Sequence, residues 1–433
     1  MLYFLQIKYN SYLFLKNLLD TQCNLFNISI LRIIVVCFIN TQKHIENLFW
    51  EKEMKKLLLA TVASVAMATA VSADDVKIGV FLGYTGPIES LVAKMGPAAE
   101  EAIAEVSASG TFMNGSTVTA VKADTTCVDA SAATAAAERL ITSDKVSGIV
   151  GGDCSGVTMA TLTNVAMPNG MVMISPSATS PGFSTAEDNG LFFRTAPSDA
   201  VQGVVMTEII MDRGYNSVAL TYTNNDYGKG LADSFSAAYE AAGGEVTISA
   251  SHEDGKADYS AEVGALAAAG GEILVVAGYL DQGGKGIIQA SIDTGAFDIF
   301  VLPDGMVGDA LPEAIGSDLD GSFGQAPNFD DSPFAGESYD AAALIMLAMQ
   351  AAGSSNPADY KSKVFDVANA PGEKIQKGEL AKGMKILAAG GEIDYVGASQ
   401  VELVGAGEAK GVYKEIEIKG GKLTTVGLRI PSL

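Results

Sequence analysis

The chain has 433 residues, with 28 Lys and Arg against 51 Asp and Glu, so its formal charge at pH 7 is −23. This acidity argues against binding to nucleic acid or to anionic membrane surfaces, both of which attract basic patches. The 360 residues beyond position 73 are too many for one ordinary domain and suit two.

A secretory signal peptide is predicted at residues 54–73. It begins with Lys55 and Lys56, continues with an apolar core over 57–71, and ends in small residues, so we expect cleavage after Ala73. The core is short for a membrane span, which makes a membrane anchor the weaker interpretation. Residues 1–53 precede this signal and differ from the rest in composition. We therefore interpret them as a mis-called N-terminal extension and Met54 as the true initiator.

Only Cys127 and Cys154 lie beyond the predicted signal peptide. In an oxidising compartment, a single pair of cysteines most simply forms a disulfide, although two buried thiols also fit the count. A bridge over that separation would stabilise the fold by about 3–4 kcal/mol in the chain-entropy model.

Short β-rich apolar runs alternate with longer Ala-rich stretches from residue 76 to residue 303. This alternation predicts parallel sheets with helices on both faces. The series restarts near residues 195–200, so the predicted fold class is α/β with two doubly wound parallel-sheet lobes. The predicted strands cover 76–82, 116–123, 147–152, 170–175 and 191–195, then 217–223, 245–251, 272–278 and 298–303.

The C-terminal part of the chain is more mixed. Residues 337–353 predict an amphipathic helix, and "VYKEIEIKGGKLTTV" alternates as a hairpin. We predict that the chain crosses between the lobes more than once, which forms a hinge with a ligand-binding cleft beside it. Lobe one is predicted at 74–196 plus about 326–405, and lobe two at about 197–325 plus 406–433.

The stretch "GGDCSGVTMA" at 151–160 could hold either a catalytic nucleophile or an anion-binding hydroxyl, in both cases Ser155. The nucleophile motif G-x-S-x-G is incomplete, because Asp153 stands in place of its first glycine. The one histidine beyond the signal peptide, His252, lies in a predicted exposed turn. A single histidine and two cysteines exclude the usual zinc sites, and no phosphate-binding glycine motif follows the first strand. We expect no enzyme, no metal and no cofactor, although a carboxylate-pair hydrolase is not formally excluded.

Two hydroxyl residues follow neighbouring predicted strands. Ser155 comes after strand 147–152, and Thr179 comes after strand 170–175. Ligands of open α/β sheets bind beyond the carboxyl ends of the strands, where helix N-termini offer free N–H groups. The pattern therefore favours a ligand carboxylate, but both hydroxyls could equally cap helices.

From about residue 76 to its C-terminus the chain resembles the periplasmic leucine/isoleucine/valine-binding proteins, which are solute receptors of ABC importers with the type I periplasmic binding fold. The resemblance rests on the order and spacing of several motifs. These are "GYTGPIESL", "DTTCVDASAATAAAERLI", "GGDCSGVTMA", "ISPSATSP", "FFRTAPSD", "NNDYGKGLADSF", "GKADYSAEV" and "FVLPDG".

The resemblance implies an amino-acid ligand held from both lobes, and a disulfide between Cys127 and Cys154. Each second-lobe residue also has a purely structural interpretation. Tyr227 and Tyr279 could simply pack within their own lobe, and Asp304 lies in a Pro-Asp-Gly turn, which favours an aspartate for local reasons. The implied contacts are Ser155 and Thr179 with the ligand carboxylate, the Ser177 carbonyl and Asp304 with its ammonium group, and Tyr227 and Tyr279 closing over it.

Two positions depart from the aliphatic-binding members of that family. The aliphatic-binding members have an apolar residue where this chain has Asp153, and a tyrosine where this chain has Leu91. Asp153 either faces the pocket, which would favour a cation or a hydrogen-bond donor on the ligand, or caps the helix near Ser155. Tyr84 and Asp281 are further polar candidates at the cleft.

The resemblance implies a periplasmic monomer that closes on its ligand and delivers it to an ABC permease with its ATPase. The ligand class is an amino acid or a related amide, and branched-chain specificity is only the family default. A diffusible sensor that feeds a chemoreceptor or signalling protein is the alternative.

Overall fold

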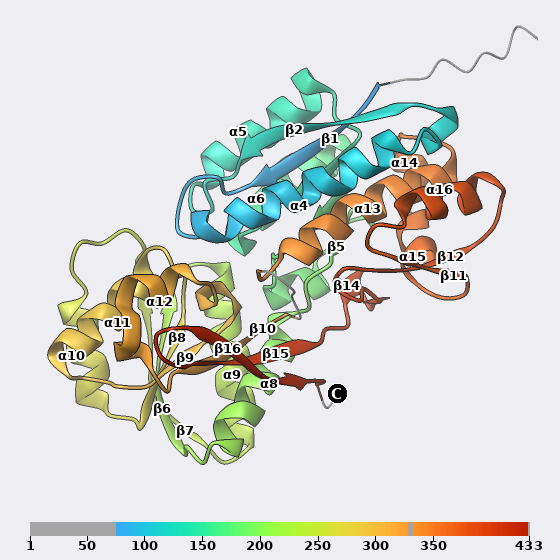
Figure 1. Ribbon diagram of the computed structural model, residues 1–433. Coiled ribbons are helices and arrows are strands. Elements are labelled where there is room, and N and C mark those ends of the chain that lie inside the picture. Colours follow the sequence, from blue (N-terminus) through green and yellow to red (C-terminus); the bar gives the residue numbers. More distant parts are fainter. Residues whose placement is uncertain (1–74, 328–331, 432–433) are drawn as a thin grey trace, which may run out of the picture. The chain divides into compact units, whose positions relative to one another are not determined.

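The computed structural model describes residues 75–327 and 332–431. The predicted signal peptide and N-terminal extension lie outside the described residues. The framework consists of two seven-stranded sheets and a small two-stranded sheet (Figure 1). The α/β prediction with two mostly parallel sheets is confirmed.

The first sheet has the order β13-β14-β5-β4-β3-β1-β2. Strands β1 to β5 run parallel, and the short pair β13–β14 is antiparallel within itself. The order places the carboxyl ends of β3 and β4 side by side. Its strands are β1 (Asp75–Leu82), β2 (Thr117–Asp124), β3 (Gly148–Gly151), β4 (Met173–Ser175), β5 (Phe192–Arg194), β13 (Leu403–Val404) and β14 (Glu408–Ala409).

The second sheet has the order β16-β15-β10-β9-β8-β6-β7. Strands β6 to β10 run parallel, whereas β15 pairs antiparallel with both β10 and β16, as the predicted hairpin requires. Its strands are β6 (Ser217–Thr223), β7 (Glu245–His252), β8 (Ile273–Ala277), β9 (Phe300–Leu302), β10 (Phe323–Pro327), β15 (Tyr413–Ile418) and β16 (Leu423–Arg429). The two-stranded sheet pairs β11 (Glu373–Gln376) with β12 (Ile393–Gly397).

Helices cover both faces of the large sheets, with α4 and α5 on opposite sides of β1 and β2 (Figure 1). In the second lobe α8 packs on α9, and α10 packs on α11. The α-helices are α4 (Glu89–Ala108), α5 (Ala130–Arg139), α6 (Ser155–Thr161), α7 (Met167–Asn169), α8 (Asp199–Asp212), α9 (Asp226–Ala241), α10 (Ser260–Ala269), α11 (Gly283–Thr294), α12 (Ala310–Ile315), α13 (Ala335–Ala352), α14 (Pro357–Tyr360), α15 (Lys363–Ala368) and α16 (Leu380–Ala388).

The chain passes between the large sheets after β5, after β10 and after β14. Strand β14 lies just beyond the predicted boundary at residue 406, yet it pairs with β5 of the first sheet. Several crossings of this kind allow a hinge, while each sheet keeps its own buried core. The lobe boundaries themselves stay a prediction.

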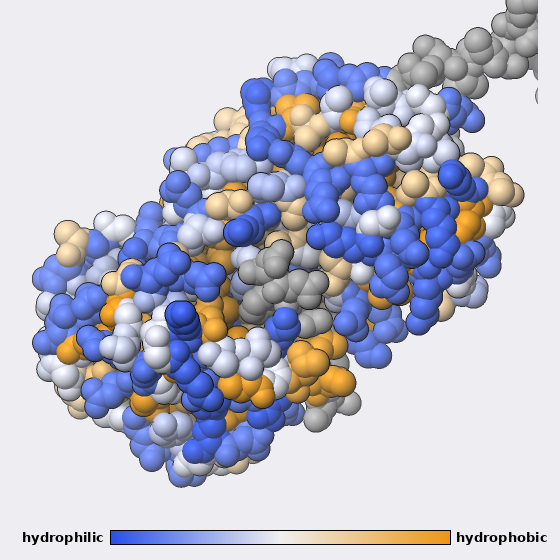
Figure 2. Space-filling view, viewed as in Figure 1, coloured by the Kyte–Doolittle hydropathy of each residue, from blue (hydrophilic) through white to orange (hydrophobic). Residues whose placement is uncertain are grey.

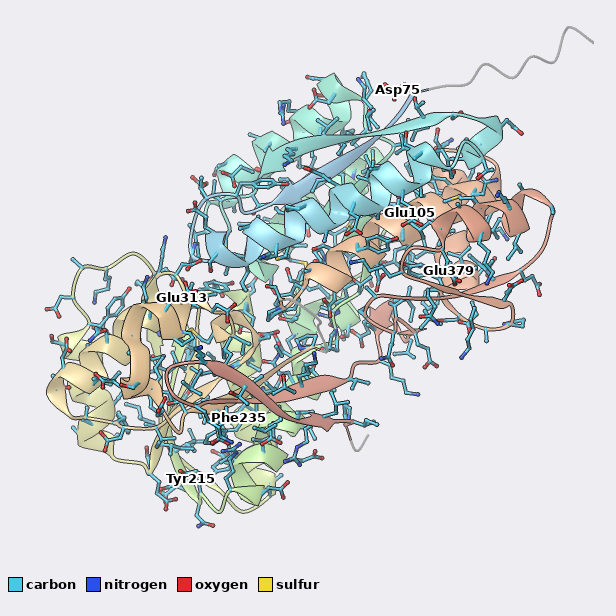
Figure 3. The ribbon with its side chains drawn as sticks, viewed as in Figure 1. Asp75, Glu105, Tyr215, Phe235, Glu313 and Glu379 are labelled. Carbon is cyan, nitrogen blue, oxygen red and sulfur yellow. A yellow bond between two sulfur atoms is a disulfide. The ribbon has the colours of Figure 1, made fainter. Side chains whose placement is uncertain are left out.

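Helix α13 is not amphipathic, which corrects the sequence prediction for residues 337–353. Every residue from Glu337 to Gln350 is buried, because α4, α15 and α16 pack around the helix. The carboxylate of Glu105 on α4 joins these helices, since it accepts a hydrogen bond from the Tyr339 hydroxyl and another from Leu380 N at 2.8 Å (Figure 3). A helix enclosed on all sides can be apolar all round.

His252 is also misplaced by the sequence prediction of an exposed turn. It is the last residue of β7 and only 1% exposed, and its Nδ1 lies 2.8 Å from the Thr221 hydroxyl. The edge of the imidazole contacts the Tyr259 ring, which folds over it from the following loop. Burial lowers the pKa of His252 to about 4, so the imidazole is neutral at physiological pH.

The visible face of the molecule is mostly hydrophilic, with small scattered groups of apolar residues (Figure 2). Within 75–327 and 332–431, no helix combines the length and apolar character that a membrane span needs.

Candidate functional site

A small cavity of about 20 Å³ lies between elements of the two large sheets. Its walls come from segments that follow β3 and β4 of the first sheet and β8 and β9 of the second, together with the starts of α4 and α9. This is the strand-end position at which open α/β sheets bind ligands. The lining residues are Ile88, Leu91, Asp153, Cys154, Ser155, Ser177, Thr179, Tyr227, Tyr279, Asp304, Gly305 and Phe334.

A disulfide fixes the loop that carries the first wall. Cys127 and Cys154 are bonded, with their Cα atoms 5.1 Å apart and a separation of 27 positions in the sequence. The bond ties the loop after β2 to the turn between β3 and α6. The predicted pairing is confirmed, and Ser155 follows directly from the anchored cysteine.

The hydroxyls of Ser155 and Thr179 do not cap helices, so that alternative is wrong. Cys154 is the N-cap of α6 and makes no side-chain cap, while the Ser155 hydroxyl accepts a hydrogen bond from Ser180 N at 3.1 Å. Ser180, not Thr179, caps the short helical turn that follows. The Thr179 hydroxyl is buried and makes no hydrogen bond of normal geometry among the described residues. Thr179 lies close to the buried carboxyl of Asp199, whose pKa it lowers.

The buried side chain of Arg194 stabilises the loop that carries Thr179. Its guanidinium donates to the carbonyls of Ala178 at 3.1 Å and Ser180 at 2.8 Å, and it forms an ion pair with Glu408. The side chain is 1% exposed. Charge-assisted bonds to two carbonyls order the loop before any ligand arrives.

Asp153 lines the cavity, but its carboxylate is already engaged by its own lobe. Oδ2 accepts a hydrogen bond from Gly83 N, and Oδ1 accepts from the Thr125 hydroxyl at 2.8 Å and from Cys154 N at 3.0 Å. The residue is 1% exposed, and burial raises the pKa of its carboxyl although all three bonds lower it. Asp153 therefore neither caps α6 nor offers a bare carboxylate to the cavity.

The second wall combines two stacked tyrosines with a carboxylate. The rings of Tyr227 and Tyr279 stack with their centroids 5.2 Å apart, and the Tyr227 hydroxyl donates to Oδ1 of Asp304 at 2.7 Å. Gly305 N donates to the same oxygen at 2.7 Å. Oδ2 of Asp304 is buried and has no hydrogen bond of normal geometry among the described residues, and burial raises the pKa of this carboxyl.

Asp199 is a second buried carboxylate that sequence reasoning missed. It is the first residue of α8, it is 0% exposed, and neither of its oxygens has a hydrogen bond of normal geometry among the described residues. Burial raises the pKa of Asp199 well above its usual value, and the charge of Asp304 raises it further, against the lowering effects of Thr179 and Arg194. In the sequence, this residue reads as an ordinary acidic residue at a helix start.

The remaining wall of the cavity is apolar. Ile88 and Leu91 come from the start of α4, and Phe334 comes from the residue before α13. Of these only Leu91 was predicted as a site residue. Ile88 lies within the motif GYTGPIESL but was not singled out, and no motif marks Phe334. Tyr84 is not among the lining residues, and its ring lies against Gly96 on α4. Asp281 also lies outside the cavity wall.

The match to known proteins agrees with this arrangement. A family model described as periplasmic binding protein matches residues 75–338. The chain belongs to the periplasmic binding protein family. Members of this family are solute-binding proteins, not enzymes, and the chain is a two-lobe receptor of that kind.

Relatives and solved structures extend this result. The chain is 30% identical over 328 residues to the Leu/Ile/Val-binding protein homolog 1 of Brucella melitensis biotype 1, which covers 70% of this chain and 86% of that protein. The branched-chain amino acid transporter substrate binding protein of Streptococcus pneumoniae, solved in complex with isoleucine, aligns with a TM-score of 0.67 at 21% identity over 83% of this chain and 100% of the other. A solute binding protein of an ABC transporter from R. palustris, solved with benzoate, aligns with a TM-score of 0.64 at 20% identity over 83% and 97%.

Proposed function

We propose that this protein is the periplasmic receptor of an ABC importer and that it captures a free amino acid with an uncharged side chain. The observation that carries this proposal is the division of the cavity into a hydroxyl side and a carboxylate side. Free amino acids are zwitterions at neutral pH, and each end of the molecule matches one side.

The carboxylate of the ligand binds to the first lobe. Ser155 and Thr179 supply hydroxyls, and the first turn of α6 supplies backbone N–H groups at a helix N-terminus. No side-chain cation lines the cavity among the described residues, so neutral donors carry this half of the recognition.

The ammonium group of the ligand belongs beside Asp304, with the Ser177 carbonyl opposite and Asp199 behind. Burial raises the pKa of both carboxyls, and the charge of Asp304 raises that of Asp199 further, so the ionised pair is costly without an additional cation. An ammonium group that donates to Oδ2 of Asp304 would relieve this cost, while the Tyr227–Tyr279 stack closes over the ligand and excludes water.

The side chain of the ligand faces Ile88, Leu91 and Phe334. This apolar surface has no partner for a charge, and the Asp153 carboxylate is already engaged by three donors. Burial of a ligand cation or anion there would cost several kcal/mol. We therefore propose apolar or small uncharged amino acids rather than basic or acidic ones.

Closure of the lobes around the ligand would create the form that a membrane permease recognises. The relatives, which include Leu/Ile/Val-binding proteins, support transport of amino acids. The predicted signal peptide and the Cys127–Cys154 disulfide support a periplasmic location. Delivery to a sensor instead of a permease stays the alternative prediction.

An aromatic carboxylate is the second candidate ligand, because the R. palustris neighbour was solved with benzoate. Benzoate has no ammonium group, so it would bring no cation to Asp304. That difference makes the two candidates separable.

A ligand panel tests the proposal. The protein is stripped of bound ligand by unfolding and refolding, and its melting temperature is measured with L-alanine, L-valine, L-leucine, L-lysine, L-glutamate and benzoate. A ligand at 100 times its dissociation constant adds about 2.7 kcal/mol to the free energy of unfolding, which is readily measured. We expect shifts with one or more of the three apolar amino acids. A shift with benzoate alone, or with no compound, would overturn the proposal.

A further inference from the structure

Helix α4 begins without a capping side chain of its own. Its N-cap residue is Ile88, which makes no side-chain cap. The first N–H groups of a helix have no partner within the helix, so a helix that starts on an apolar residue needs acceptors from elsewhere.

The acceptor for α4 comes from the other lobe. Asp281 follows β8 of the second sheet, and its Oδ2 accepts a hydrogen bond from Ser90 N in the first turn of α4 at 2.9 Å. In return, Asp281 N donates to the carbonyl of Pro87 at 3.2 Å. These two bonds join segments that lie 191 residues apart in the chain.

An apolar contact lies directly beside these hydrogen bonds. Leu91 of α4 packs close to Leu280 and Gly308 of the second lobe, since a Cβ built on Gly308 would lie 2.8 Å from Cδ1 of Leu280 and 3.3 Å from Cδ2 of Leu91. Leu91 also lines the ligand cavity. The first turn of α4 thus contacts the cavity and the opposite lobe at the same time.

We propose that Asp281 is an interlobe latch, a residue that caps α4 only when the lobes are closed and so raises ligand affinity without contacting the ligand. A hinge opening would separate Asp281 from Ser90 and leave both groups to water. Because the ligand is enclosed only in the closed form, whatever favours that form strengthens binding in proportion. A carboxylate is well suited to this position, because the N-terminus of a helix carries partial positive charge.

The latch is separate from the specificity of the site. Asp281 does not line the cavity, so its removal should weaken binding of every ligand by the same factor. It should also act on dissociation rather than association, because the bonds form after the ligand has entered.

The test compares full-chain Asp281→Ala and Asp281→Asn with the wild type. Asp298→Ala removes an exposed carboxylate from the same lobe and is the matched control. L-Valine is the probe for affinity and dissociation rate, and hydrogen exchange of the Ser90 amide reports the latch bond directly. The melting temperature of the ligand-free variants reports any damage to the fold.

We expect Asp281→Ala to bind L-valine about 3- to 10-fold more weakly, mainly through faster dissociation, because this is the usual loss for a helix cap. Asp281→Asn keeps an acceptor and should lose less, and Asp298→Ala should match the wild type. The Ser90 amide should exchange faster in Asp281→Ala. Unchanged dissociation in Asp281→Ala would overturn the latch.

Failure of the proposed ligand class would give a different result from failure of the latch. If L-valine and the other amino acids fail to bind the wild type, the comparison rests on the Ser90 amide alone. The exchange comparison is then made with whichever compound of the panel the wild type does bind, benzoate included, so that the lobes are closed. Faster exchange of the Ser90 amide in Asp281→Ala would support the latch, and equal exchange in the two ligand-bound proteins would overturn it.

Discussion

The two lobes meet the cavity with opposite chemistry. Lobe one presents hydroxyls on loops that are ordered by a disulfide at Cys154 and by the buried guanidinium of Arg194. Lobe two presents the carboxylate of Asp304 under a pair of stacked tyrosines. Donors therefore lie mainly on one side of the cavity and acceptors mainly on the other.

This difference between the lobes indicates that lobe one supplies a preordered binding surface and lobe two supplies a carboxylate that needs a partner. The first-lobe loops keep their shape through bonds that do not involve a ligand, so little order has to be created when a carboxylate binds. The second-lobe carboxylate keeps an oxygen without a hydrogen bond of normal geometry among the described residues, so it gains most from a ligand. The predictions below test each half in turn.

The largest effect is expected from Asp304→Asn in lobe two. Loss of one partner from a buried charge pair costs about 3–5 kcal/mol. L-Valine affinity, measured by calorimetry, should therefore fall about 100- to 4,000-fold. Asp298→Asn, an exposed change in the same lobe, is the control and should bind as the wild type does. An Asp304→Asn protein that binds within threefold of the wild type would remove the acceptor half of the comparison.

The disulfide should contribute strongly to the stability of the lobe-one loops that carry Cys127, Cys154 and Ser155. The double variant Cys127→Ala/Cys154→Ala releases a loop closed over a separation of 27 residues, which should cost about 3–4 kcal/mol in the chain-entropy model. Denaturant unfolding measures this loss, with ligand affinity as a second readout. An unfolding midpoint equal to that of the wild type would show that these loops do not depend on the disulfide for their stability.

Acid should destabilise the protein through His252, the buried last residue of β7. Burial lowers the pKa of this imidazole to about 4, whereas its ordinary value is 6.5. The unfolded chain therefore binds a proton that the folded chain does not, so stability falls as the pH drops from about 6.5 to about 4. The loss attributable to His252 is about 3 kcal/mol.

The variant His252→Gln isolates that contribution. The free energy of unfolding is measured against pH for both proteins, and carboxylates affect both curves alike. We expect a shallower slope for the variant between about pH 6.5 and pH 4. Parallel curves would mean that the imidazole takes up a proton in the folded state.

The smallest effect is expected from Thr179→Val in lobe one. The change removes one hydroxyl and keeps the shape, so L-valine binding should weaken about 10-fold, as for a single hydrogen bond of about 1–1.5 kcal/mol. Thr207→Val is the matched control, since that buried hydroxyl donates to the Gly203 carbonyl one turn earlier in its own helix. Equal losses in the two variants would point to general destabilisation rather than ligand contact.

Much of the framework could be predicted from the sequence. Strands β1 to β9 fall close to the apolar runs, because buried parallel strands need such runs. The disulfide was the simplest interpretation of the cysteine count, and the family resemblance implied the same pairing. Ser155, Thr179 and Asp304 came from motif order, and the structure brings them to one cavity, although their role in binding stays a prediction.

The errors have a common physical cause, which is that burial depends on distant partners. His252 stands in a hydrophilic stretch, but Tyr259 and the backbone near Gly283 cover it. Helix α13 contains polar residues that suggest an exposed face, yet three helices enclose it. Phe334 and Asp199 carry no local signal, since only the tertiary fold decides what they face.

One measurement tests the central claim most directly. Calorimetry compares L-valine with 3-methylbutanoate, which lacks the ammonium group, and with isobutylamine, which lacks the carboxylate, on the wild type and on Asp304→Asn. The account predicts that only L-valine binds tightly to the wild type, and that its advantage over 3-methylbutanoate largely disappears in Asp304→Asn. Binding of 3-methylbutanoate to the wild type as tightly as L-valine would contradict it.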